Sequence, residues 1–151
     1  MISIAHRIDP RYKTYAEAQE FCKNETMNGF TTGRLLEPKT QSFLDKVYFE
    51  SELVFGYRGV TGEINKANKH YLRKDTWMGI IRINTTSYQG NKWVYASSGD
   101  DLEFQNVYGG GFRYKLDIAE CAILHVSPWK NHQGWFDQLC YLKHAVICEF
   151  L

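Results

Sequence analysis

The chain has 151 residues, a formal net charge of +1 and an aromatic content of 15%. A single domain of this length has room for a real core, because it buries roughly 70% of its unfolded surface. The small net charge gives no electrostatic footprint for nucleic acid, and no apolar run approaches the roughly 20 residues that span a bilayer. We therefore expect one domain over residues 1–151.

The N-terminal part predicts an extended segment and then a capped helix. Residues 2–12 alternate charged with apolar positions, and Pro10 suits the edge or the end of a strand. Thr14 and Glu17 have the spacing of a capping box, so we expect a helix to start there. Its apolar face carries Ala18 and Cys22, and residues 24–33 are rich in the Asn, Thr and Gly of a loop.

A short buried strand over 34–36 and a second helix come next. Thr40 is a suitable cap, and the residues after it form an i, i+1, i+4, i+5 apolar stripe: Phe43, Leu44, Val47 and Tyr48. The pattern does not define where this helix ends. Residues 51–75 are the hardest part to interpret, and their basic run over 66–74 is typical of a solvated loop. A contact with phosphate or an acidic glycan is the alternative.

From residue 76 onward the pattern becomes that of strands. Residues 76–83, 92–95, 121–126 and 144–150 are rich in β-branched and aromatic types, whereas 102–111 is irregular and ends in three glycines. We expect Trp77 and Trp93 to lie in the core. Two helices followed by a run of strands predict the α+β class with a mostly antiparallel sheet.

Four cysteines, an even number, favour disulfides, and three connectivities are open. Buried free thiols are one alternative. A zinc site is another, but the chain has no Cys-x-x-Cys pair, and His125, His132 and His144 lack finger spacing.

Two features concern secretion. The sequons at Asn24 and Asn84 are compatible with a secreted glycoprotein. The first residues are too polar for a signal peptide, so we interpret Met1 as a start residue added after the signal was removed. A chain that is not secreted is the alternative.

Short motifs follow one another along the chain in a recognisable order. They are the helix with Cys22, Gly33-Arg34-Leu35, Trp77-Met78-Gly79-Ile80, Trp93 to Gly99, Cys121, Gly134-Trp135-x-Asp137-x-x-Cys140, and Ile147-Cys148-Glu149. In this order they resemble the C-type lectin-like domain over nearly the whole chain. The resemblance implies two helices and a mostly antiparallel twisted sheet with a long irregular loop region. It also implies the short form of the domain, with bridges Cys22–Cys148 and Cys121–Cys140.

The sugar-binding members of that family hold calcium through carboxylate and amide oxygens, and calcium takes six to eight oxygen ligands. The family's Glu-Pro-Asn or Gln-Pro-Asp triplet falls on residues 111–113, which read Gly-Phe-Arg. Its acid two residues before the third cysteine falls on Ala119, and its amide falls on Phe136. Only Asp137 is retained, so we expect no metal cofactor at the usual sugar site.

Other acids lie in the same region and offer a relocated calcium site as the alternative. They are Asp100, Asp101, Glu103, Asp117 and Glu120. Their spacing does not match an EF-hand loop, and a few acids on a polar loop are usually solvated.

Aromatic and hydrogen-bonding side chains gather in the long-loop region, a mixture typical of recognition surfaces. The expected ligand-binding residues are Phe112, Arg113, Tyr114, Trp129, Asn131, His132 and Asp137. In the alternative interpretation, Trp129 and Phe136 pack the loop against the sheet. Trp135 is expected to be structural.

The sequence thus predicts a secreted or extracellular recognition module for a glycan or protein ligand, with a homodimer among the open arrangements. We expect no nucleic-acid partner and no membrane insertion. A calcium-dependent lectin with a relocated metal site and a structural or assembly domain are the alternatives. We do not expect an enzyme, because Ser127, His125, His132 and Asp137 lack any catalytic signature spacing.

Overall fold

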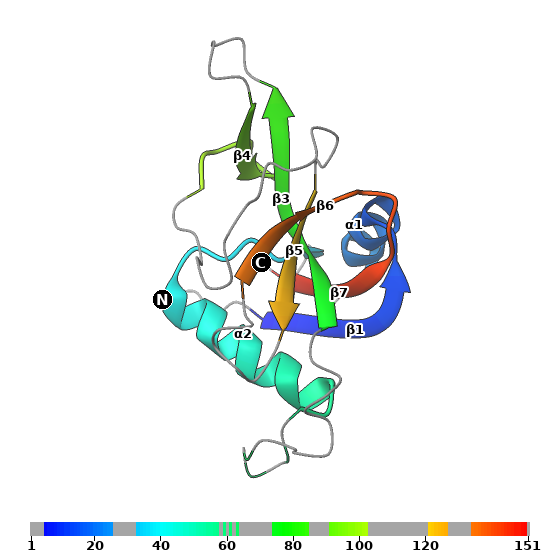
Figure 1. The fold of residues 1–151 in the computed structure, drawn as a ribbon, viewed down its shortest axis with the longest axis vertical. Helices are drawn as coiled ribbons and strands as arrows, with labels where there is room; N and C mark the ends of the chain where they lie inside the picture. Colours follow the sequence, from blue (N-terminus) through cyan, green and yellow to red (C-terminus); the bar gives the residue numbers. More distant parts are fainter. Residues whose placement is uncertain are drawn as a thin grey trace.

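The computed structural model describes residues 5–25, 33–57, 59, 61, 63, 74–84, 91–102, 121–126 and 134–150. Two helices and seven strands lie in these ranges (Figure 1). In chain order they are β1 (Ala5–Lys13), α1 (Tyr15–Asn24), β2 (Gly33–Leu35), α2 (Gln41–Val54), β3 (Lys74–Asn84), β4 (Asn91–Tyr95), β5 (Cys121–Val126), β6 (Gly134–Gln138) and β7 (His144–Phe150). No helix in the described ranges has the length and apolar character needed to cross a membrane.

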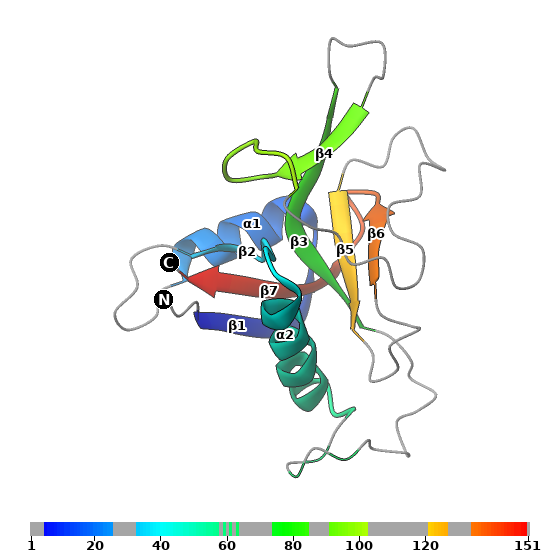
Figure 2. The same ribbon diagram turned by 90° about the vertical axis from the view of Figure 1, so that its left-hand side faces the viewer.

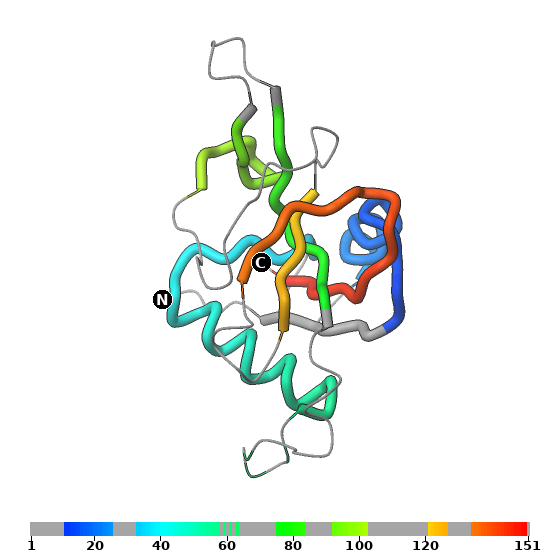
Figure 3. Tube along the Cα trace, viewed as in Figure 1, coloured from blue at the N-terminus to red at the C-terminus, as the bar shows by residue number. Residues whose placement is uncertain are grey.

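All seven strands join in one sheet. Its main path runs β1-β7-β3-β5-β6, with β2 also beside β7 and β4 beside β3. Among the described pairs, β3 and β7 run parallel, and the others run antiparallel. Figure 3 shows β7, in red, passing beside β3, and Figure 2 shows the β3–β4 hairpin extending away from the two helices. The α+β class with a mostly antiparallel sheet is confirmed.

Both predicted helix starts are confirmed. The Thr14 hydroxyl accepts a hydrogen bond from the Glu17 N–H, and the Glu17 carboxyl accepts one from the Thr14 N–H, which completes the capping box of α1. Thr40 caps α2 by accepting from the Phe43 N–H. Helix α2 continues to Val54, an end that the sequence pattern left undefined.

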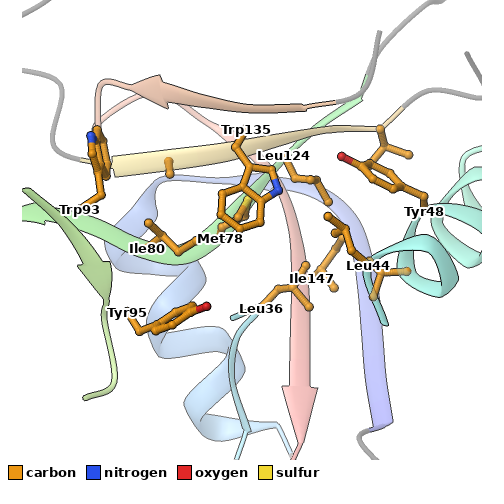
Figure 4. Packing of buried hydrophobic residues seen from close by; sticks show 13 residues of the cluster. Leu36, Leu44, Tyr48, Met78, Ile80, Trp93, Tyr95, Leu124, Trp135 and Ile147 are labelled. Carbon is orange, nitrogen blue, oxygen red and sulfur yellow. The ribbon is translucent and has the colours of Figure 1, made fainter. Parts of the chain in front are cut away.

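The side chains of the sheet alternate between two hydrophobic clusters, as the two-residue period of a strand requires. Trp77 and Cys148 belong to the cluster that contains buried residues of α1, and Met78 and Ile147 to the one that contains buried residues of α2. The two helices therefore cover opposite faces of the sheet. Figure 4 shows the second cluster, in which Trp135 lies among Met78, Leu124 and Ile147.

The three tryptophans that the structure describes are core residues. Trp77 and Trp135 are fully buried, and Trp93 is 6% exposed. The predictions that Trp77 and Trp93 belong to the core and that Trp135 is structural are confirmed.

Two disulfides close the fold, and both implied pairings are confirmed. Cys22–Cys148 joins α1 to β7 across 126 residues of sequence, and Cys121–Cys140 joins the start of β5 to the residues after β6 across 19 residues. The described part of the chain contains no free cysteine. The alternatives of four free thiols and of a zinc site built on these cysteines are therefore wrong.

The two bridges should differ in their contribution to stability, because a longer closed loop removes more entropy from the unfolded chain. We expect Cys22→Ala/Cys148→Ala to lower the free energy of unfolding by about 5 kcal/mol, and Cys121→Ala/Cys140→Ala by about 3 kcal/mol. Urea unfolding of the two non-reduced double variants measures both values. Equal losses, or a larger loss for the short bridge, would contradict the loop-length argument.

Candidate functional site

The ends of segment 103–120 are anchored in one row of residues across the sheet. Asp101 forms a bridge with Val94 of β4, and Val94 pairs with Ile81 of β3. Ile81 pairs in turn with Cys121, the first residue of β5, and Cys121 pairs with Gln138 of β6. The described residues on either side of segment 103–120 therefore lie in a single row, and the Cys121–Cys140 bridge fixes the residue that follows the segment.

Asp137 is the one predicted ligand-binding residue that lies in the described ranges. It sits in β6 opposite Ala122, next to the row that anchors segment 103–120, and it is half-buried. Its side chain shares a face of β6 with Trp135, two residues away. The other predicted ligand-binding residues lie outside the described ranges: Phe112, Arg113, Tyr114, Trp129, Asn131 and His132.

The described strands separate the points at which those six residues attach to the fold. Residues 112–114 belong to the segment that returns at Cys121, whereas residues 129, 131 and 132 belong to the segment that joins Val126 to Gly134. Cys121 and Val126 are the two ends of β5, a strand of six residues. At about 3.3 Å per residue, these ends are roughly 17 Å apart. The two groups thus attach at opposite ends of one strand.

The resemblance assigns calcium ligands to two described positions, Phe136 and Asp137, and only Asp137 offers a side-chain oxygen. Phe136 occupies the position of the amide ligand, and its ring packs against the imidazole of His125 with the ring centroids 4.0 Å apart. A phenyl ring offers no oxygen to calcium, which requires several. Phe136 therefore acts as a packing residue at this position.

Asp100 and Asp101 are the described members of the alternative acid cluster, and both are exposed. The Asp101 carboxyl pairs with the Lys92 ammonium at 2.9 Å, and both side chains are exposed. Within the described ranges, no three His, Cys, Asp or Glu side chains are grouped closely enough to hold a metal ion. Glu103, Asp117 and Glu120 lie outside those ranges.

His125 has a partner that the sequence did not indicate. Its Nδ1 contacts the Asp75 carboxyl from the start of β3. The strand register places His125 opposite Gly134, three positions from Asp137. The carboxyl that orients this imidazole is therefore that of Asp75, and Ser127 and His132 lie outside the described ranges.

A polar cluster built on two buried acids was not indicated by the sequence pattern. Glu149 of β7 is fully buried, and Glu37, which follows β2, is 2% exposed. The Glu149 Oε1 accepts hydrogen bonds from the Glu37 N–H and from the Arg34 Nε, the latter at 3.3 Å. Glu37 in turn accepts from the N–H and the hydroxyl of Ser97, at 3.0 and 2.8 Å. The cluster links β2, β7 and the turn after β4.

Burial, with a smaller contribution from the neighbouring Glu37 carboxylate, raises the pKa of Glu149 from 4.5 to about 7. The Arg34 guanidinium and the Glu37 N–H act in the opposite direction but do not offset the loss of hydration. The second oxygen, Oε2, is buried and has no hydrogen-bond partner among the described residues. An acid inside the apolar strand from Ala145 to Phe150 was the sequence signal for this group.

Gly79 makes room for the cluster. A Cβ atom at this position would lie 2.9 Å from both the Leu35 carbonyl oxygen and the Glu37 Cγ. The Gly79 N–H donates to the Leu36 carbonyl at 2.7 Å, and its own carbonyl accepts from the Ala96 N–H at 2.8 Å. The chain after β2 and the turn after β4 thus meet at this glycine.

The pKa of Glu149 makes stability depend on pH. The folded state binds the Glu149 proton more tightly than the unfolded state does. The stabilisation from this proton is therefore complete below about pH 4.5 and is lost as the pH rises through about 7. Glu149→Gln keeps the shape but cannot ionise. We expect its unfolding free energy, relative to the wild type, to increase by about 3 kcal/mol between those limits, because one pKa unit corresponds to about 1.4 kcal/mol.

Urea unfolding across this pH range measures the difference. Glu20→Gln, which removes an exposed carboxyl from α1, is the matched control and should keep the pH dependence of the wild type. A constant difference between Glu149→Gln and the wild type would contradict the assigned proton.

Comparison with known proteins finds C-type lectin folds among the solved structures that resemble this one. No model of a protein family matches the chain. The chain is 21% identical to the snaclec stejaggregin-B subunit alpha of Trimeresurus stejnegeri over 146 residues, which cover 97% of this chain and 75% of the relative.

Two solved structures show the same arrangement. The C-type lectin CEL-I from Cucumaria echinata has a TM-score of 0.68 at 10% identity, with 100% of this chain and 92% of that chain covered. The human scavenger receptor C-type lectin carbohydrate-recognition domain has a TM-score of 0.60 at 16% identity, with 97% and 89% covered. Together with the two disulfides, these similarities show that the chain has the C-type lectin fold in its short form.

Proposed function

We propose that this chain is an extracellular recognition module that binds a carbohydrate or protein ligand without the usual calcium-dependent sugar site. The observation that carries the proposal is the anchoring of segment 103–120 at both ends on one row of the sheet, beside Asp137. A fixed sheet that presents a long connecting segment is a common basis for recognition. The packing of Phe136 against His125 supports a mode of binding that does not use calcium.

The proposed contact residues at the Cys121 end are Phe112, Arg113, Tyr114 and Asp137. Aromatic rings stack on the apolar faces of sugars or fill pockets of a protein partner, and the two charged groups supply directional hydrogen bonds. Trp129, Asn131 and His132 form a second group with the same chemistry. Because the two groups attach at opposite ends of β5, their contributions are separable by mutation.

A printed glycan array, read in calcium and in EDTA, tests the binding proposal, and titration calorimetry then gives the Kd of the strongest glycan. We expect binding in EDTA, and we expect Phe112→Ala/Tyr114→Ala to weaken it at least about tenfold, since buried aromatic anchors dominate such contacts. Trp129→Ala reports on the second group. Phe49→Ala, which removes an exposed aromatic side chain from α2, is the control and should leave the Kd unchanged.

Thermal unfolding separates the proposal from the calcium-dependent alternative. A ligand that binds only the native state raises its melting temperature by mass action. We expect the same melting temperature in about 5 mM calcium as in EDTA. A rise of several degrees that Asp101→Asn abolishes, together with glycan binding lost in EDTA, would favour the relocated calcium site.

The proposed location is outside the cell or in a secretory compartment, because both disulfides are formed and such bonds persist in oxidising environments. Asn24 is exposed at the end of α1, and Asn84 ends β3 at the hairpin. Each asparagine is the first residue of a sequon, the acceptor sequence for N-glycosylation in secreted proteins. We expect each to carry an N-linked oligosaccharide after expression in a eukaryotic secretory host.

Intact mass before and after treatment with peptide N-glycosidase measures this occupancy. Asn24→Gln and Asn84→Gln should each remove one glycan. Asn91→Gln, which changes the strand partner of Asn84 without touching a sequon, should remove none. A secreted chain with the mass of the bare polypeptide would contradict the prediction.

A further inference from the structure

A polar cluster ties the last strand to the turn that leads toward segment 103–120. Its two acids, Glu37 and Glu149, are buried, whereas Arg34 is half-buried and Ser97 is exposed. The carboxyl of Glu37 holds Ser97 by two hydrogen bonds, one to its N–H and one to its hydroxyl. The Tyr95 N–H donates to the Asp100 carbonyl at 2.9 Å and closes the turn. Glu37 therefore holds the turn over residues 96–100, two residues before the segment begins.

Two acids in this cluster share one guanidinium. The Arg34 Nε lies 3.3 Å from the Glu149 Oε1, and its Nη1 lies 3.8 Å from the Glu37 Oε1. Nη1 also donates to the Ser97 hydroxyl at 3.1 Å. With Glu149 neutral, the charge of Arg34 balances that of Glu37. With Glu149 ionised, two carboxylates compete for the same cation.

Tyr15 and Lys23 of α1 are two further titratable groups near this cluster. On the α1 side, Tyr15 is close enough to Glu37 for the carboxylate to contribute to its raised pKa. Lys23 lines a cavity of about 120 Å³ beside the cluster, together with Arg34, Glu37 and Ser97. The second oxygen of Glu149 is left without a hydrogen-bond donor among the described residues.

We propose that Glu149 and Glu37 form a proton-operated latch on the turn over residues 96–100. When the Glu149 carboxyl holds its proton, Arg34 is available to Glu37 and the hydrogen bonds to Ser97 are kept. When the O–H bond breaks and the proton passes to water, the second carboxylate draws Arg34 away and the hold on Ser97 loosens. The latch closes in acid and opens toward alkaline pH, with its midpoint near neutrality.

The latch would regulate the proposed function. It rests on that proposal only in assuming that segment 103–120 binds the ligand. Loosening of the turn would change the position from which that segment departs. The proton therefore regulates recognition through the scaffold, without contacting the ligand. The latch itself is a property of the unliganded fold.

Nuclear magnetic resonance of the wild-type chain tests the latch directly. The carboxyl carbon of Glu149 and the amide of Ser97 are followed from about pH 5 to about pH 8.5, a range that brackets the raised pKa. We expect both signals to change with one midpoint near neutrality. We also expect the hydrogen-exchange protection of the Ser97 amide, corrected for its intrinsic rate, to fall about tenfold above that midpoint.

Glu149→Gln should abolish the midpoint at Ser97, and Glu20→Gln should preserve it. A Ser97 amide that does not respond while Glu149 titrates would overturn the latch, as would titration of Glu149 near the ordinary range of a glutamic acid. The wild-type titration decides the question even if Glu149→Gln folds poorly.

The readout needs no ligand, so a negative glycan array and a failed latch are separate results. The strongest glycan from the array then tests the coupling. Its Kd should shift several-fold between about pH 5.5 and pH 8 in the wild type and stay constant in Glu149→Gln. An equal shift in both proteins would overturn the coupling.

Discussion

The arrangement of this protein depends on β7 and on the disulfide that fixes it. The strand pairs with β1 and β2 on the N-terminal side of the chain and with β3 in the middle of the sheet. Cys148 lies opposite both Arg7 and Leu35, and its bridge to Cys22 holds α1 against this part of the sheet. A segment from the end of the chain therefore organises elements from its beginning.

The same strand carries a buried acid next to its cysteine. Burying a carboxyl is unfavourable unless hydrogen bonds replace its hydration. Glu149 receives two such bonds through one oxygen and none through the other among the described residues. An apolar side chain would pack there at lower cost, but it would not position Arg34 and Glu37. The buried acid lowers the stability of the fold, and in return the cluster connects β7 to the turn that leads toward segment 103–120.

Local patterns in the sequence predicted the elements, and long-range contacts account for what they missed. The capping box at Thr14 is a contact between residues three apart, and it is visible in the sequence. The contacts of Glu149 with Glu37 and of His125 with Asp75 span 112 and 50 residues. No periodicity reports such pairs. The separation of the predicted ligand-binding residues likewise became visible only from the bounds of β5 in the structure.

The fold by itself does not determine the ligand, because one fold supports many kinds of site. The change at Phe136 illustrates how the difference arises. The phenyl ring lacks the amide oxygen, and it also packs against His125, whose Nδ1 contacts Asp75. Recovery of a metal ligand at this position would therefore disturb a contact that reaches β3. With Phe136 in a packing contact, the recognition that we propose would rely on residues of the two segments that join β5 to its neighbours in the chain.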